Sequence, residues 1–266
     1  MDRISTKFES LRSANRKALI PFITAGDPSL EATVPVMHAL VKTGADIIEL
    51  GVPFSDPMAD GPTIQRSSEQ ALRRGAGLRY VLQAVAGFRQ QDADTPVVLM
   101  GYLNPIEIHG YARFAQEATQ AGVDGVLLVD LPPEEAAETR DIFTRHGVAL
   151  IALASPTTSP ERMAMLCDTA QGYLYYVSFA GVTGAGHLDT HAAGERLHTL
   201  RARSQVPVVA GFGIKDATSA LAMSLEADGV VVGSALVAIL AEATDPADAA
   251  SRAAAFLAPL REALDA

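Results

Sequence analysis

The sequence predicts a (β/α)8 barrel, an α/β fold in which eight parallel strands alternate with helices. Eight short runs of aliphatic and β-branched residues recur along the 266 residues, and amphipathic stretches separate them. The runs are continuously apolar, as in parallel strands that are covered on both faces. They lie at residues 19–24, 46–51, 96–100, 125–130, 148–153, 173–178, 207–211 and 229–233. An open, doubly wound sheet is the alternative with the same order of elements.

The opening residues 2–15 predict an extra helix, because Phe8 and Leu11 fall on one helical face. We expect this helix to cover the N-terminal mouth of the barrel. No linker, low-complexity tract or charge block interrupts the chain, so we expect one domain over residues 1–266.

Turn residues indicate where the helices begin and end. Small residues and an acid precede three of the strands, at 43–46, 121–124 and 226–229. Asp27, Ser159 and Asp245 each place a capping oxygen before a proline that suits the first helical turn. Pro35 lies inside the first inter-strand helix, which must therefore kink there or begin later than Asp27 suggests.

Composition argues against several classes of protein. The formal net charge of −10 repels the phosphate backbone of nucleic acids and anionic membrane surfaces. No apolar run is long enough to span a bilayer, and the N-terminal residues lack the apolar core of a signal peptide. The single cysteine, Cys167, has no partner for an internal disulfide, and we expect it to fill the core. The expected location is the cytoplasm.

The second strand places Glu49 among aliphatic residues near its C-terminal end, where barrels of this kind hold their chemistry. Burial of an ionised carboxylate is unfavourable and raises its pKa from ~4.3 toward neutrality, where the group both donates and accepts protons. Pairing with a helix N-terminus or a nearby cation is the alternative, and the position favours a catalytic role.

The loop that follows, residues 52–62, is rich in prolines and acids. For an isolated loop, Asp56 and Asp60 would be turn residues, since Asp56 precedes Pro57 and Asp60 precedes Gly61. A second carboxylate within reach of Glu49 would instead form a pair suited to proton transfer.

Glycine clusters follow the last three strands, at 181–186, 211–213 and 233. This pattern indicates a phosphate site made by backbone amides, with the Ser234 hydroxyl, because Lys215 is the only cation near the last two clusters. Tight strand-to-helix turns also favour glycine and are the alternative.

Lysines and histidines narrow the reaction further. None of the lysines lies at an inward-facing C-terminal strand end, which argues against an imine-forming aldolase; they are Lys7, Lys17, Lys42 and Lys215. His187 and His191 have the spacing of helical metal ligands but no third ligand, so we expect no metal site.

Several motifs of the sequence occur together in one known family. They are Glu49, the loop 53–62 (PFSDPMADGP), and the segments 21–28, 104–105, 130–132, 181–184 and 211–214. On these motifs the sequence closely resembles the tryptophan synthase alpha subunit family over nearly the whole chain. The resemblance implies a cofactor-free retro-aldol cleavage of indole-3-glycerol phosphate to indole and glyceraldehyde 3-phosphate.

The resemblance also implies roles for single residues. Glu49 would transfer protons, and Asp60 would accept the indole N–H and stabilise the indolenine cation. Tyr175 would hydrogen-bond near Glu49, and Thr183 would meet Asp60 on loop closure. Two further groups would bind substrate: an apolar slot for indole (Phe22, Met100, Leu127, Phe212), whose members are equally explained as core, and a phosphate site (Gly184, Gly213, Gly233, Ser234).

The same resemblance implies a beta subunit that carries pyridoxal phosphate, within a heterotetramer of two alpha and two beta subunits, whereas this chain needs no cofactor. The expected contacts are Asp56, Asn104 and Pro132, in the loops 53–60, 102–108 and 131–135. These loops also carry apolar residues that suit docking, namely Phe54, Met58, Tyr102, Leu103 and Ile106. Alternatively, the loops only shape the rim of a self-sufficient enzyme.

Two other function classes stay open at this point. One is a different phosphosugar barrel enzyme, such as an isomerase. The other is a regulatory partner that has lost catalysis, against which the presence of both Glu49 and Asp60 argues.

Overall fold

Eight parallel strands close into a barrel in strand order β1 to β8 in the computed structural model, which describes residues 2–177, 190–211 and 213–266. The predicted barrel is therefore confirmed, and the open doubly wound sheet is excluded. The strands are β1 (Ala18–Thr24), β2 (Ile48–Gly51), β3 (Val97–Gly101), β4 (Gly125–Leu128), β5 (Ala149–Ala154), β6 (Leu174–Val177), β7 (Val208–Gly211) and β8 (Gly229–Val232).

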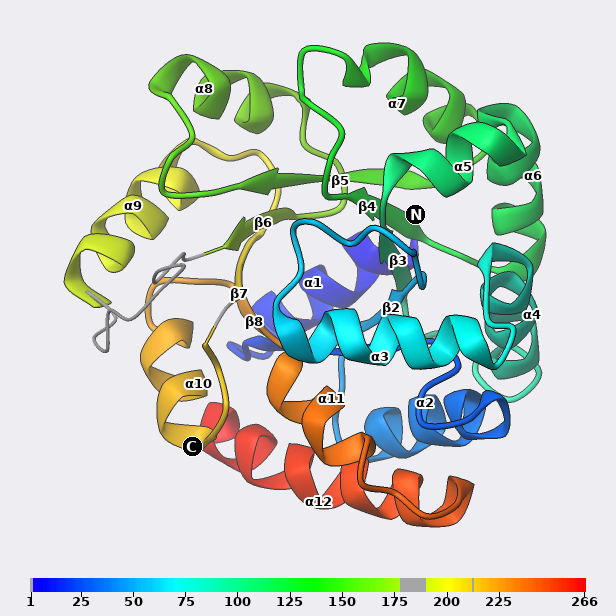
Figure 1. The fold of residues 1–266 in the computed structure, drawn as a ribbon. Coiled ribbons are helices and arrows are strands. Elements are labelled where there is room, and N and C mark those ends of the chain that lie inside the picture. Colours follow the sequence, from blue (N-terminus) through cyan, green and yellow to red (C-terminus); the bar gives the residue numbers. More distant parts are fainter. Residues whose placement is uncertain (1, 178–189, 212) are drawn as a thin grey trace.

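Helices surround the barrel, and one helix lies across its end (Figure 1). They are α1 (Arg3–Ser13), α2 (Thr33–Lys42), α3 (Pro62–Arg73), α4 (Leu78–Phe88), α5 (Leu103–His109), α6 (Tyr111–Ala121), α7 (Ala136–Arg145), α8 (Pro160–Thr169), α9 (Thr190–Arg203), α10 (Ala217–Ser224), α11 (Ser234–Leu240) and α12 (Pro246–Asp265), with a 3-10 turn at Leu30–Ala32. None of the helices in these described residues is long and apolar enough to cross a membrane.

Both faces of the strands are buried, which explains their continuous apolar character. Alternate residues of each strand point inward or outward. The outward set packs under the helices, and the inward set fills the barrel together with α1. Cys167, on α8, is buried and forms no disulfide, as expected.

The N-terminal helix α1 covers one mouth of the barrel, as predicted. Ile4, Phe8 and Leu11 are buried with the barrel interior, and the Phe8 ring lies 6.0 Å from the ring of Tyr173. Asp2 caps the helix by accepting a hydrogen bond from the Ser5 backbone N–H. The apolar face of α1 therefore completes the core at this end.

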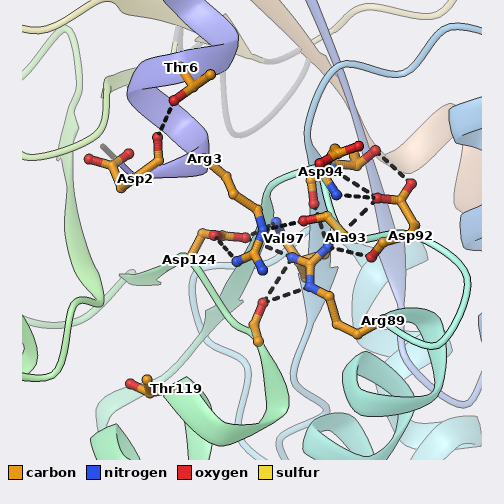
Figure 2. A network of polar contacts seen from close by, with 12 residues as sticks. Asp2, Arg3, Thr6, Arg89, Asp92, Ala93, Asp94, Val97, Thr119 and Asp124 are labelled. Carbon is orange, nitrogen blue, oxygen red and sulfur yellow. Dashed lines mark hydrogen bonds and ion pairs between the residues drawn. The ribbon is translucent and has the colours of Figure 1, made fainter.

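A polar network fastens α1 to the barrel (Figure 2). Asp124, which precedes β4, accepts Arg3 Nη1 at 2.9 Å on one oxygen and Arg89 Nη2 at 2.8 Å on the other. The second oxygen also accepts the Val97 backbone N–H at 2.8 Å. Arg89 donates in addition to the Gly122 carbonyl at 2.8 Å. One carboxylate thus joins α1, the end of α4 and two neighbouring strands.

Asp124 is one of three acids that the sequence placed in turns before strands. Each accepts a backbone N–H from the first or second residue of the preceding strand: Leu19 to Asp46 at 2.9 Å, Val97 to Asp124 at 2.8 Å, and Val208 to Asp228 at 2.9 Å. These carboxylates fix the register between neighbouring strands at the end of the barrel where the strands begin.

Two of the three predicted helix starts are confirmed. Ser159 and Asp245 cap α8 and α12 through their side chains. The prediction for Asp27 is wrong, because its carboxylate instead accepts Ser67 Oγ and Arg74 Nη1, both at 2.7 Å. The helix begins later, at Thr33, and this start places Pro35 in the first turn without a kink.

Candidate active site

Glu49 lies on the inner face of β2 with no exposed surface, in register with Phe22 on β1 and Val98 on β3. Burial raises the pKa of Glu49 from 4.5 to about 7, and a hydrogen bond from Tyr173 offsets part of the rise. Both protonation states of the carboxyl group are therefore populated near neutral pH.

Tyr173 donates its hydroxyl proton to Glu49 Oε1 at 2.7 Å. The other carboxylate oxygen, Oε2, is buried and has no hydrogen-bond partner among the described residues. Burial and the charge of Glu49 hold the pKa of Tyr173 well above its usual value, so the phenol remains a donor. One oxygen of Glu49 is thus fixed by the protein, while the other is available to a substrate.

Sequence reasoning chose Tyr175 for this neighbourhood and missed Tyr173. The two residues are two positions apart and share the inner face, so this spacing could have indicated both. Tyr175 is also buried, and its hydroxyl lies against β7: a Cβ at Gly211 would come within 2.1 Å of it. Glycine at 211 therefore makes room for the phenol.

The loop between β2 and α3 is held by Tyr102, which lies directly after β3. Its hydroxyl accepts the Ala59 backbone N–H at 3.0 Å and donates to the Asp60 carboxylate. Its ring packs against Phe54 with a centroid distance of 5.2 Å. Gln65, on α3, donates to the Asp60 carbonyl at 2.9 Å.

These contacts position Asp60 in a half-buried site. Burial raises the pKa of Asp60, and the Tyr102 hydrogen bond lowers it again in part. Burial and the charge of Asp60 raise the pKa of Tyr102, which therefore stays a donor. Sequence reasoning treated Tyr102 only as part of an apolar surface, although its position at the end of β3 could have indicated a site residue.

Three of the four residues expected to enclose the indole ring lie in the described part of the chain. The Phe22 ring lies over Gly51, where a Cβ would come within 2.6 Å of it, and beside Gly233, where a Cβ would stand 3.6 Å from the ring atom Cδ1. Met100 and Leu127 belong to the same inner cluster. Phe212 lies outside the described residues.

The expected phosphate residues lie after the last strands. Gly213 follows β7 with a φ of 70°, which favours glycine. Gly233 and Ser234 form the start of α11 after β8. Gly184, together with Thr183, lies outside the described residues.

The described residues contain no group of three or more His, Cys, Asp and Glu side chains that could hold a metal ion. His187 lies outside the described residues, and the structure describes only the backbone of His191.

The expected docking residues lie on the surface, since Asp56 and Asn104 are exposed and Pro132 is half-buried. The apolar part of that prediction needs correction. Tyr102 and Ile106 are buried, because one holds the loop before α3 and the other packs into the core. Met58 is 83% exposed, as a docking residue should be. Ile108, which the prediction did not single out, is 80% exposed.

Comparisons with known proteins identify the family. A family model described as the tryptophan synthase alpha chain matches residues 8–265. The chain is 76% identical over 266 residues to the tryptophan synthase alpha chain of Xanthomonas axonopodis pv. citri, with 100% of this chain and 99% of that protein covered. The chain belongs to the tryptophan synthase alpha chain family.

Solved structures agree with this assignment to the tryptophan synthase alpha chains. The alpha subunit from Legionella pneumophila is 48% identical, with a TM-score of 0.93, and the match covers 100% of this chain and 99% of that one. A tryptophan synthase structure from Mycobacterium tuberculosis is 38% identical, with a TM-score of 0.89 and coverage of 100% and 99%. Alpha chains of this family are the lyase subunits that cleave indole-3-glycerol phosphate, and this chain is one of them.

Proposed function

We propose that the chain cleaves indole-3-glycerol phosphate with Glu49 as the general acid–base group and Asp60 as the electrostatic partner of the indole nitrogen. The reaction breaks the bond between indole C3 and the glycerol carbon that carries the adjacent hydroxyl. A proton arrives at C3, and the hydroxyl loses its proton as the C=O bond of glyceraldehyde 3-phosphate forms. Indole leaves as the second product.

The state of Glu49 is the observation that carries this proposal. Its pKa of about 7 lets one carboxyl group give a proton to C3 and take one from the hydroxyl within the same turnover. Its Oε2 atom lacks a partner within the described residues, and it lies inside the barrel. The Tyr173 bond to Oε1 orients the group.

Asp60 completes the pair. Protonation at C3 places positive charge on the indole ring nitrogen, and a carboxylate that accepts this N–H stabilises the charge in the transition state. Tyr102 and Gln65 orient the segment that carries Asp60. Tyr175 lies in the inner cluster of the barrel beside Gly211.

The remaining site residues bind the substrate. Phe22, Met100 and Leu127, with Phe212, enclose the indole ring. Gly213, Gly233 and Ser234, with Gly184, hold the phosphate through backbone amides and one hydroxyl. Thr183 contacts Asp60 when the substrate is bound.

No lysine takes part. Lys17 lies before β1, at the opposite end of the barrel, and donates to the Ala227 carbonyl at 2.7 Å. Lys215 is exposed beyond β7. Proton transfer by carboxylates therefore replaces imine formation in the cleavage of the carbon–carbon bond.

The chain acts in the cytoplasm with a beta subunit, which binds pyridoxal phosphate and consumes the indole, in a heterotetramer of two alpha and two beta subunits. This chain carries no cofactor of its own. Asp56, Asn104 and Pro132 contact that subunit. The exposed side chains of Met58, in the loop before α3, and of Ile108, on α5, support this orientation.

The test is incubation of the chain with indole-3-glycerol phosphate, without cofactor or metal, followed by detection of indole. We expect indole from the wild-type chain and at least ~100-fold less from Glu49→Gln and Asp60→Asn, because each amide nearly preserves shape but removes the ionisable group. Wild-type turnover in either variant would contradict the role of that residue.

A further inference from the structure

A cavity of about 300 Å³ lies outside the barrel, between α7, α8 and the outer face of β5. Its volume falls at the lower end of the range for small-ligand sites. Ala136 and Arg140 line it from α7, one turn apart, and Arg162, Leu166 and Thr169 line it from one face of α8. It does not include any of the proposed catalytic residues.

Hydrogen bonds at two points join α7 and α8, or the residues next to them, around this cavity, on the side of the barrel where Figure 1 shows α7 beside α8. At one end, Arg162 donates from Nε and Nη2 to the two oxygens of Glu134, at 2.6 and 3.1 Å. At the other end, Gln171 Nε2 donates to Thr144 Oγ1 at 2.8 Å. The cavity is therefore framed at both ends of the helix pair.

Of the charged groups that line the cavity, two already have partners and one does not. Arg162 is neutralised by the paired contact with Glu134. The Asp130 carboxylate accepts the Leu103 backbone N–H at 2.8 Å. Arg140 also lines the cavity, and its guanidinium has no ion pair or hydrogen bond within the described part of the chain. Its five N–H donors are thus the ones available to a ligand.

We propose that this cavity binds a small organic anion, with an apolar body against β5 and Leu166 and with its acidic group on the Arg140 guanidinium. Leu150, Ala152 and Leu166 supply an apolar wall, and Arg140 supplies the charged group without a partner in the described residues, a combination found in small-ligand sites. A planar carboxylate matches the paired N–H groups of arginine, which makes a carboxylic acid the best-fitting class.

The site adjoins the loop between β4 and α7, because Asp130, Leu131, Pro132 and Pro133 form part of its lining. Pro132 is also a proposed contact with the beta subunit, so this step rests on the proposed function. An anion in the cavity packs against this loop and therefore changes the affinity of the chain for the beta subunit.

The experiment titrates the full chain with 2-naphthoate and, as a neutral analogue of the same shape, with 2-naphthamide, by calorimetry. We expect the wild-type chain to bind naphthoate at least about tenfold more tightly than the amide, as for a hydrogen bond to a charged group. Arg140→Gln removes this difference. The matched control Arg145→Gln, at the exposed end of the same helix, retains it.

The Ala152→Leu variant tests whether the compounds bind in this cavity. It places a larger side chain from β5 into the cavity, so we expect it to abolish binding of both compounds. Circular dichroism and indole formation verify that this variant is folded. Absence of binding, equal affinity for acid and amide, or an unchanged preference in Arg140→Gln would overturn the site.

The link to docking is measured separately, as the dissociation constant for the beta subunit with and without saturating naphthoate. We expect a change of at least about threefold, lost in Arg140→Gln. An unchanged dissociation constant would overturn the link between the cavity and docking, and the naphthoate titration would still decide whether the cavity binds an anion. If the chain does not bind the beta subunit in either condition, the proposed partner is contradicted instead.

Discussion

The burial that suits Glu49 to its proposed catalytic role also lowers the stability of the fold above the pKa of an exposed glutamate. The unfolded chain releases its proton near pH 4.5, whereas the folded chain holds it to about pH 7 because the carboxyl is fully buried. Between these values the folded state binds more protons, so its stability falls as pH rises through this window. The difference corresponds to roughly 3 kcal/mol.

Glu49→Gln should therefore gain stability relative to the wild type as pH rises. We expect the free-energy difference of unfolding between variant and wild type to move by roughly 3 kcal/mol in favour of the variant from pH 4.5 to pH 8. Urea unfolding at both pH values measures it. The exposed Glu138→Gln is the control and should show no such trend, and a pH-independent difference at residue 49 would contradict the raised pKa.

Tyr173→Phe tests the hydrogen bond at Glu49 Oε1. The bond stabilises the charged carboxylate, so its loss should raise the pKa of Glu49 further, by about one pH unit for a charge-assisted bond. The acid limb of the kcat/KM profile for indole formation should shift to higher pH by that amount. Tyr175→Phe is the matched control, because the hydroxyl of Tyr175 lies against Gly211. Equal shifts in the two variants would show that Tyr173 is not the particular donor.

At the scale of single residues, the sequence predicted that Glu49 is a site residue, because its carboxylate lies in an apolar strand near the C-terminal end of a barrel strand. It did not distinguish Tyr173 from Tyr175, since both share one face and only the side-chain positions decide which hydroxyl reaches Oε1. The catalytic roles of Glu49 and Asp60 stay predictions, and so do the roles of Thr183, Gly184 and Phe212, which lie outside the described residues.

Elements were predicted well wherever one local signal determined them. All eight strands lie where continuous apolar runs placed them, because two-sided burial leaves a clear pattern. The cap at Asp27 was mispredicted because this residue has the local signature of a cap, yet Ser67 and Arg74, 40 and 47 residues away, donate to its carboxylate. Such long-range competition leaves no local trace. The later start of α2 is one of the two outcomes that Pro35 predicted.

The attachment of α1 to the barrel gives an element-scale prediction. Asp124→Ala removes the acceptor shared by Arg3, Arg89 and the Val97 N–H. It leaves the largely buried guanidinium of Arg89 with only the longer contact to Asp92, at 3.9 Å, as an ion pair within the described residues. We expect a loss of about 3 kcal/mol in unfolding free energy, as when a buried ion pair is broken. Denaturant unfolding measures it.

The control for this variant is Glu69→Ala, which breaks the exposed pair with Arg73 and should cost no more than about 0.5 kcal/mol. At a temperature where both variants are folded, indole formation should match the wild type, since Asp124 lies at the end of the barrel opposite the catalytic loops. Similar stability losses in the two variants would argue against the network.

On the scale of the whole molecule, the two ends of the barrel have different composition. The end where the strands begin carries α1 and the carboxylates that fix strand register. The opposite end carries Glu49, Asp60 and two exposed apolar side chains, Met58 in the loop before α3 and Ile108 on α5. This separation is the one expected of barrel enzymes, in which one face supplies stability and the other supplies chemistry.

Docking of the beta subunit should therefore depend on the loop end alone. Met58 and Ile108 expose 83% and 80% of their surface there, and burial of such side chains at an interface stabilises a complex. We expect Met58→Ser and Ile108→Ser each to raise the dissociation constant for the beta subunit by about tenfold, at ~1.4 kcal/mol per decade. Leu225→Ser is the control, because Leu225 is 68% exposed but follows α10 at the opposite end. Its dissociation constant should equal that of the wild type. Calorimetry with the beta subunit from the same source measures all four chains, and equal effects of the three substitutions would place the docking surface elsewhere.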